Sequence, residues 1–225
     1  MKRVLLCLLM AVFLTACGRE VAVATAPTAT EKILATEPVQ TLPEPADADF
    51  VRVLDYIPTA YQELRYATED NFTGQVIYDF RDTYLRYGTV KKLMAVSADL
   101  EEMGMHLKIW DGFRPVAAQF RLWEVYPDPT YVADPTKGYS SHSRGNTVDL
   151  TVVDSNGVEF PMPTDFDDFS LKADRDYADC GEEEKNNAMI LQLIMEKHGF
   201  TGYAGEWWHY SDTDSYPVEE VFQPS

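Results

Sequence analysis

The composition of this 225-residue chain changes abruptly near residue 50. From residue 18 to about residue 49 the chain is rich in Ala, Thr, Pro and Glu and has almost no aromatic residues. Such a stretch cannot bury enough apolar surface to offset the entropy lost on ordering it, so residues 17–49 are expected to form a flexible tether. Residues 50–225 carry nearly all the aromatic side chains and suit one domain with a single hydrophobic core.

The first sixteen residues have the organisation of an export signal. Lys2 and Arg3 precede an apolar run over residues 4–14, which is shorter than the ~20 residues of a membrane-spanning helix. The run ends in Leu14-Thr15-Ala16-Cys17, which resembles a bacterial lipobox, where cleavage precedes a cysteine that is then lipidated. We therefore expect residues 1–16 to be a lipoprotein signal peptide and the exported protein to be anchored at the cell envelope by lipid on Cys17 alone. The alternative is an ordinary signal peptide with a chance cysteine.

The net charge limits the classes of binding partner, and the cysteine content limits the ways in which the domain can be stabilised. The chain has 19 Lys and Arg and 37 Asp and Glu, and cleavage after residue 16 removes two positive charges, which leaves 17 − 37 = −20. A nucleic acid or an anionic lipid surface is a poor partner for so acidic a protein. Cys180 is the one cysteine of residues 50–225, so stability must come from the core, with or without a metal, rather than from a disulfide.

Hydrophobic spacing predicts a mixed fold. Helices are expected over residues 90–104, 115–125 and 182–198, and strands over residues 106–110, 147–153 and 206–210. In the last helix the apolar residues Met189, Ile190, Leu193 and Ile194 are expected to face inward, with Gly199 as its stop. Because helices and strands do not alternate regularly, the fold class is α+β with a mostly antiparallel central sheet flanked by helices.

Three residues are candidates for metal ligands. His142 lies in a loop, Asp149 follows within the next expected strand, and His209 closes the run Glu206-Trp207-Trp208-His209. A catalytic zinc takes three such ligands and keeps one position for water. Spacing alone leaves a second interpretation open, in which His142 is a solvated loop side chain and His209 is a core histidine.

Glu206 favours the metal interpretation. A carboxylate beside two tryptophans is costly to bury unless its charge is compensated. A water activated by zinc compensates it, and the carboxylate can take the proton of that water, because zinc lowers the pKa of water to about 7. Glu206 is therefore the expected catalytic base, and the alternative is an exposed glutamate at the end of a strand.

Five segments, in order from about residue 60 to residue 212, resemble the zinc D-alanyl-D-alanine peptidases. Residues 140–149 resemble their SxHxxGxAxD motif, and residues 206–209 resemble their Glu-x-x-His element. Residues 65–74, residues 110–115, and Phe166-Asp167 after Pro161-Met162 resemble segments of the VanX-type D-alanyl-D-alanine dipeptidases. The resemblance implies a fold like that of the hedgehog domain and the D,D-peptidases.

The resemblance also implies a reaction and a role for each site residue. The reaction is hydrolysis of D-Ala-D-Ala, or of a related small peptide, by water activated on one Zn²⁺. Glu206 acts as base and then as acid, and Arg114 stabilises the oxyanion, although a surface ion pair with Asp111 is the alternative for this arginine. The remaining roles are the metal ligands His142, Asp149 and His209, the ammonium-binding Asp167, and the site-lining Tyr66 and Ser140. For Asp167 the alternative is a simple acidic turn.

Two departures from the family pattern bear on the substrate. Thr147 stands where the motif has alanine, and the segment over residues 126–137 is shorter than in the dipeptidases, which is expected to open one wall of the pocket. Two other functions stay open: a D,D- or L,D-carboxypeptidase that trims peptidoglycan stem peptides, and a non-catalytic zinc module that binds wall peptides. Retention of Glu206 and Arg114 beside the three ligands argues against the second.

Overall fold

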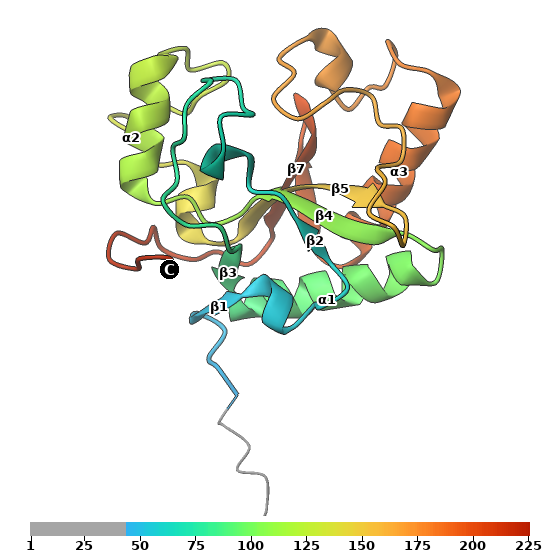
Figure 1. The fold of residues 1–225 in the computed structure, drawn as a ribbon, viewed down its shortest axis with the longest axis horizontal. Coiled ribbons are helices and arrows are strands. Elements are labelled where there is room, and N and C mark those ends of the chain that lie inside the picture. The colour runs from blue at the N-terminus through green and yellow to red at the C-terminus, as the bar shows by residue number, and fades with distance from the viewer. Residues whose placement is uncertain (1–43) are drawn as a thin grey trace, which may run out of the picture. The chain divides into compact units, whose positions relative to one another are not determined.

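A five-stranded sheet with the order β2-β4-β5-β7-β6 organises the domain (Figure 1). The computed structural model describes residues 44–225. Strand β2 runs parallel to β4, and the other neighbours are antiparallel. The strands are β2 (Tyr61–Gln62), β4 (His106–Asp111), β5 (Thr147–Val153), β6 (Phe200–Tyr203) and β7 (Glu206–Asp212). A second, antiparallel pair joins β1 (Phe50–Arg52) to β3 (Tyr84–Arg86). The predicted α+β class is confirmed.

Residues 44–225 form three α-helices, which are α1 (Tyr87–Glu101), α2 (Val116–Val125) and α3 (Glu182–Lys197). Helices α1 and α3 pack on the strands, while α2 lies to one side (Figure 1). The short 3₁₀ turns are η1 (Val53–Asp55), η2 (Arg65–Ala67), η3 (Ser141–Arg144) and η4 (Leu171–Ala173). Helix α1 contacts α3 and β4, while α3 lies along β6 and β7. Within residues 44–225, none of the helices has the length and apolar character needed to cross a membrane.

The inward face predicted for α3 is wrong in part. Met189 and Leu193 are 41% and 63% exposed, whereas Ala188, Leu191 and Met195 are buried. Positions 188, 191 and 195 follow the i, i+3, i+7 spacing of one helix face, and Met189 and Leu193 lie to one side of it. The helix has more apolar residues than one buried face can hold, so its sequence is compatible with two overlapping apolar faces. Only packing against β6 and β7 distinguishes them.

Alternation along β5 separates the core from the site. All seven residues of this strand are buried, and Val148, Leu150 and Val152 belong to the same apolar cluster as Val90 and Leu93 of α1. Successive side chains of a strand point to opposite faces. Asp149 therefore points away from the α1 side of the sheet, which places its carboxylate on the other face.

Part of the predicted tether contacts the domain. The hydroxyl of Tyr87 donates to Glu44 at 2.7 Å, and Nη1 of Arg86 donates to the carbonyl of Ala48 at 2.6 Å. Contacts with the domain thus begin before the boundary at residue 50 that composition suggests. The predicted signal peptide, the lipid site at Cys17 and the tether up to residue 43 lie outside the described residues.

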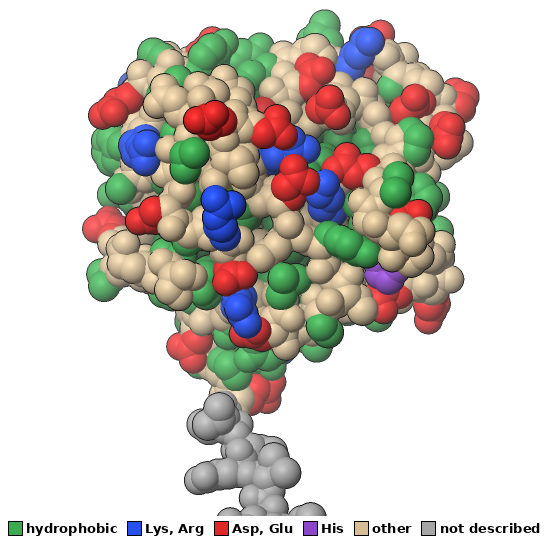
Figure 2. All heavy atoms as spheres, viewed as in Figure 1, with side chains coloured by type: hydrophobic (Ala, Val, Ile, Leu, Met, Phe, Trp, Pro, Cys, Tyr) green, Lys and Arg blue, Asp and Glu red, His purple; other side chains and the backbone are tan. Residues whose placement is uncertain are grey.

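The visible surface carries charges of both signs. Figure 2 shows Asp and Glu side chains spread over this face, with Lys and Arg side chains between them. Several of the basic side chains of the domain are paired with carboxylates, among them Lys91 with Asp47 and Lys108 with Glu159. An exposed pair such as Lys91 with Asp47 contributes little to stability, so the core must supply most of it.

Gly145 makes the turn that leads from η3 into β5. Its φ of 75° lies in the left-handed region, and its amide donates to the carbonyl of His142 at 3.0 Å. A Cβ at this position would lie 2.4 Å from the ring of Phe50. Gly145 is therefore required both by its backbone conformation and by the close approach of an aromatic ring.

We expect Gly145→Ala to lower the free energy of unfolding by about 3 kcal/mol, because left-handed strain of about 1 kcal/mol adds to overpacking against Phe50. Gly74→Ala is the matched control, since Gly74 has a φ of 62° but open space where a Cβ would lie. The control should lose only the strain, about 1 kcal/mol. Urea unfolding at equilibrium measures both, and equal losses would contradict the role assigned to Phe50.

Candidate metal and catalytic site

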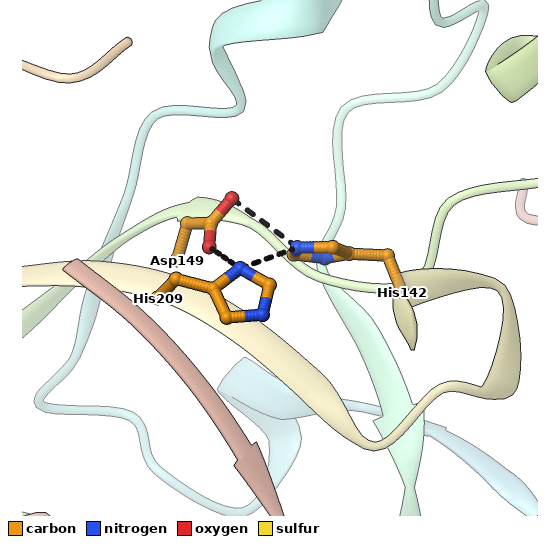
Figure 3. Close-up of side chains that lie close together, drawn as sticks. All are labelled: His142, Asp149 and His209. Atoms are coloured by element: carbon orange, nitrogen blue, oxygen red, sulfur yellow. Dashed lines mark hydrogen bonds and ion pairs between the residues drawn. The ribbon is translucent and has the colours of Figure 1, made fainter. Parts of the chain in front are cut away.

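The side chains of His142, Asp149 and His209 point toward one another (Figure 3). Nε2 of His142 lies 3.3 Å from Oδ2 of Asp149 and 3.3 Å from Nδ1 of His209. Nδ1 of His209 lies 3.0 Å from Oδ1 of Asp149. The three residues predicted as metal ligands are thus brought together from η3, β5 and β7.

Local structure explains how each of the three reaches this point. Asp149 and His209 are paired residues of the antiparallel β5–β7 ladder, so their side chains leave the sheet side by side. His142 comes from η3, where Oγ of Ser140 accepts the amide of His142 at 3.3 Å. Ser140 is therefore the cap of this turn, and within residues 44–225 its hydroxyl donates to no hydrogen-bond acceptor.

A carbonyl fixes the orientation of the His142 ring. Nδ1 of His142 lies 2.9 Å from the carbonyl oxygen of Gly112. Since a carbonyl can only accept, Nδ1 carries the hydrogen, and Nε2 offers its lone pair to the point where Asp149 and His209 meet. An outer hydrogen bond of this kind is what orients histidine ligands in metal sites.

The donor set fits a zinc ion. Oδ1 of Asp149 is buried, and Nδ1 of His209 lies 3.0 Å from it but outside hydrogen-bonding geometry, so no described residue hydrogen-bonds this oxygen. That is costly for a carboxylate unless a cation lies beside it. In a tetrahedral zinc site with bonds of about 2.0–2.2 Å, neighbouring donors lie roughly 3.3–3.5 Å apart, close to the separations found here. Burial opposes ionisation of Asp149, but the neighbouring His142 and His209 hold its pKa below the ordinary range. The carboxylate is therefore ionised, as a ligand must be.

Glu206 lies beside the three donors at the start of β7. Its Oε2 is 3.6 Å from Nδ1 of His209. Burial raises the pKa of Glu206, His209 opposes this shift, and the charge of Asp149 adds to it. A carboxylate with a raised pKa is a stronger base than an ordinary glutamate, which suits it to proton transfer near neutral pH.

Arg114 is held in a buried network behind the donors. Its Nε and Nη2 donate to Oδ2 of Asp111 at 3.1 and 2.7 Å, and its Nη1 donates to Gln119 at 2.8 Å. The other oxygen of Asp111 accepts the hydroxyl of Tyr78 at 2.7 Å. The ion pair considered for Arg114 thus exists, but both partners are buried and the arginine lines the pocket.

Sequence reasoning missed the roles of Tyr78 and Gln119. Tyr78 contacts an aspartate 33 positions later in the chain, and no local pattern marks such a contact. Gln119 bonds both Arg114 and the carbonyl of Ala133, the latter at 2.8 Å. The position of Gln119, one turn into the helix that follows Arg114, was a signal for this contact, because the first turn of that helix lies next to the arginine.

Asp167 and Tyr66 form the other end of the site. The hydroxyl of Tyr66 donates to Oδ2 of Asp167 at 3.0 Å, and the guanidinium of Arg114 lies over the Tyr66 ring, 5.1 Å from its centre. Asp167 has a φ of 59°, a strained conformation for a non-glycine residue that is frequent at functional sites. Burial and the charge of Asp149 raise the pKa of Asp167 well above that of an ordinary aspartate.

One pocket of about 240 Å³ collects the site residues. Every predicted ligand, catalytic and substrate-binding residue lines it: Tyr66, Arg114, Ser140, His142, Asp149, Asp167, Glu206 and His209. Residues 129–133 also line it, so the segment over residues 126–137 supplies part of a wall. The hydroxyl of Thr147 is bonded to Oγ of Ser211 at 2.9 Å, so the departure from alanine is accommodated between β5 and β7.

The fold and this site define a metallopeptidase. A family model of the M15 peptidases, described as D-Ala-D-Ala dipeptidase, matches residues 46–223. The chain belongs to this family.

The named relatives agree with the family. A D-alanyl-D-alanine dipeptidase of Escherichia coli strain K12 is 36% identical over 158 residues, which cover 69% of this chain and 81% of the relative. A D-alanyl-D-alanine dipeptidase of Enterococcus faecalis strain V583 is 32% identical over 176 residues, which cover 69% and 87%. Among solved structures, VanYB in complex with D-Ala-D-Ala has a TM-score of 0.41 at 15% identity, covering 61% of this chain and 79% of VanYB.

We expect zinc to stabilise the protein through His209. With free zinc at about 1,000 times the dissociation constant, binding adds about 4 kcal/mol to the free energy of unfolding. His209→Ala should lose this gain, because it removes one of three donors. The control His198→Ala should keep it, since His198 pairs with Asp99 away from the pocket. Thermal unfolding with and without zinc measures the effect, and an undiminished gain in His209→Ala would refute the ligand set.

Proposed function

We propose that this protein is an exported zinc dipeptidase that hydrolyses D-Ala-D-Ala. The observation that carries the proposal is the joint presence in one pocket of the donor triad, a base, an arginine and a carboxylate suited to an ammonium group. Relatives named D-alanyl-D-alanine dipeptidase at 36% and 32% identity support this substrate. The pocket of about 240 Å³ is of a size for a small ligand rather than for a folded polypeptide.

Zinc bound by His142, Asp149 and His209 would supply Lewis acidity, which activates water and polarises the substrate carbonyl. Glu206 takes a proton from the attacking water as the water oxygen bonds to the amide carbon. The same carboxyl then gives the proton to the leaving nitrogen, so that the amide bond breaks and two amino acids are released. Its raised pKa suits both transfers, because the group then ionises nearer to the working pH.

Arg114 is placed to meet the negative charge that develops on the carbonyl oxygen. A guanidinium has five N–H donors, and three are used on Asp111 and Gln119. Two remain for the substrate, and the guanidinium cannot rotate because Asp111 and Gln119 hold it. A fixed donor of this kind stabilises the transition state by about 3 kcal/mol.

Asp167 is placed to select a free amino terminus. Its carboxylate faces the pocket, held by the Tyr66 hydroxyl. Desolvation of a carboxylate is costly, and a substrate ammonium group would offset that cost. A dipeptide presents this ammonium one residue from the scissile amide, whereas a longer peptide places another residue there. This arrangement favours dipeptides over stem peptides.

The first test is amine release from D-Ala-D-Ala by zinc-loaded protein, beside a stem pentapeptide. We expect cleavage of the dipeptide only, and Glu206→Gln should lower kcat by about 10²–10⁴-fold with unchanged zinc affinity, because only proton transfer is lost. Glu182→Gln, at the exposed start of α3, is the control and should match the unaltered protein.

Other outcomes of this assay reject the proposal in distinct ways. Release of D-Ala from the pentapeptide without dipeptide cleavage would identify a carboxypeptidase. Zinc binding without turnover of either substrate would identify a binding module.

The second test uses the raised pKa of Asp167. Ammonium binding needs the ionised carboxylate, so KM for D-Ala-D-Ala should rise as the pH falls through this raised pKa. The rise should appear above the pH range in which ordinary aspartates titrate, because burial raises the pKa of Asp167. N-acetyl-D-Ala-D-Ala lacks the ammonium and should show no such rise, in KM or in Ki where turnover is slow.

Matched variants assign this pH effect. Asp167→Asn should raise KM for the free dipeptide at pH values above the raised pKa, where the unaltered carboxylate is ionised, and should remove the difference between the two substrates. Asp168→Asn, whose side chain caps the amide of Ser170, should behave as the unaltered protein. A preference for the free dipeptide that survives in Asp167→Asn would disprove the role of this carboxylate.

Export and lipid attachment at Cys17 form part of the proposal, supported by the sequence of residues 1–17. An envelope location gives the enzyme access to wall fragments, which suits salvage or turnover of released dipeptide. Cys17→Ser should move the protein from the membrane fraction to the soluble fraction, and an unchanged distribution would reject the lipid anchor.

A further inference from the structure

Glu206 and His209 present a geometric problem. They are three positions apart on β7, and in a regular strand residues i and i+3 point to opposite faces. Nevertheless Oε2 of Glu206 lies 3.6 Å from Nδ1 of His209. The strand must therefore depart from regular geometry between these two residues.

The pairing of β6 with β7 shows where it departs. Gly202 pairs with Tyr210, and the next residue, Tyr203, pairs with Glu206. One step along β6 thus corresponds to four steps along β7, a bulge that leaves residues 207–209 without partners on β6. A bulge re-aims side chains and leaves backbone groups unpaired, and unpaired carbonyls need other donors.

Arg175 supplies these donors. It follows η4, and its guanidinium donates to the carbonyls of Trp207 and His209, both at 2.9 Å. It also donates to the carbonyls of Tyr203 at 2.8 Å and Glu206 at 3.1 Å. One side chain therefore takes the place of the missing partner strand across the bulge.

Further contacts fix the guanidinium over the hairpin. It lies over the ring of Tyr210, 4.2 Å from the ring centre, and donates to the Tyr210 hydroxyl at 3.1 Å. The backbone amide of Arg175 donates to the carbonyl of Ala204 at 2.9 Å. A Cβ on Gly202 would lie 2.3 Å from Cζ of Arg175, so the arginine needs glycine at this position of β6.

We propose that Arg175 is a positioning residue of the metal site, which holds the bulge of β7 so that Glu206 and His209 face the same point. The roles of Glu206 and His209 rest on the proposed function, but the geometry that Arg175 supports does not. Arg175 does not line the pocket that contains the donors, so it acts through the backbone of its neighbours. Its planar fork serves several carbonyls at once, which a lysine cannot do.

The experiment compares Arg175→Met and Arg175→Lys with Arg121→Met. Arg121 also donates to two backbone carbonyls, those of Val76 and Ile77, and so controls for the loss of such bonds elsewhere. Zinc affinity is measured by competition with a chelator, and the geometry of the site by the absorption spectrum of the Co²⁺-substituted protein. Turnover of D-Ala-D-Ala and thermal unfolding of the metal-free protein complete the set.

We expect Arg175→Met to weaken zinc binding by about 10–100-fold and to change the Co²⁺ spectrum, as loss of an outer partner does in metal sites. The main loss of activity should fall on kcat. Arg175→Lys should lie between Arg175→Met and the unaltered protein, and Arg121→Met should keep both zinc affinity and spectrum.

Gly202→Ala provides an independent variant should Arg175→Met fail to fold. Its Cβ would displace the guanidinium, so it should reproduce the loss of zinc affinity. In the Arg175→Lys background it should add less than its effect alone, because contacting residues are not additive.

Lower thermal stability with unchanged zinc affinity and spectrum would show a purely structural arginine and overturn the proposal. Full additivity of Gly202→Ala with Arg175→Lys would overturn it as well. If the unaltered protein cleaves no dipeptide, the proposed function fails, while the zinc and Co²⁺ measurements still decide the role of Arg175.

Discussion

The ionised carboxylate of Asp149, buried at the middle of the sheet, is the constraint on which the site depends. A charge taken out of water must be compensated, and the surrounding groups do so. His142 and His209 turn ring nitrogens towards Asp149. The ring of His142 is in turn oriented by the carbonyl of Gly112. The contact from His209 does not have hydrogen-bonding geometry, so one oxygen of Asp149 has no hydrogen-bond partner within residues 44–225, which is the chemical reason for expecting a cation there.

The two sides of the pocket are built differently. The donors come from β5, β7 and the short turn η3, whose positions are set by backbone pairing. The side proposed to hold the substrate comes from irregular segments around Tyr66, Asp167 and residues 129–133. Arg114 joins the two sides, since it is held by Asp111 and lies over the ring of Tyr66. A change on the substrate side can therefore reach the reacting groups through this arginine.

Local sequence predicted the parts of the fold that local forces determine. The strand containing Asp149 is β-branched and was predicted with its observed bounds, and the residues predicted as ligands lie together. The face of α3 was not predictable, because Met189 and Leu193 are as apolar as the buried residues beside them. Tyr78 and Arg175 were missed because their partners are 33 and 28–35 positions away, where no periodic pattern connects them.

The alternation along β5 has a consequence for how such a protein can change. Val148, Leu150 and Val152 face the core shared with α1, while Asp149 faces the pocket. Neighbouring positions of the strand are therefore constrained separately, the first three by packing and Asp149 by the chemistry of the site. The wall over residues 129–133 stands outside that core. Val132 is the exception within this wall, because it is buried in a second apolar cluster. A library of variants confined to the exposed positions 129, 130, 131 and 133 would diversify the pocket wall while leaving both apolar clusters intact. Over evolutionary time the same partition would let the wall change while the metal-binding side stays as it is.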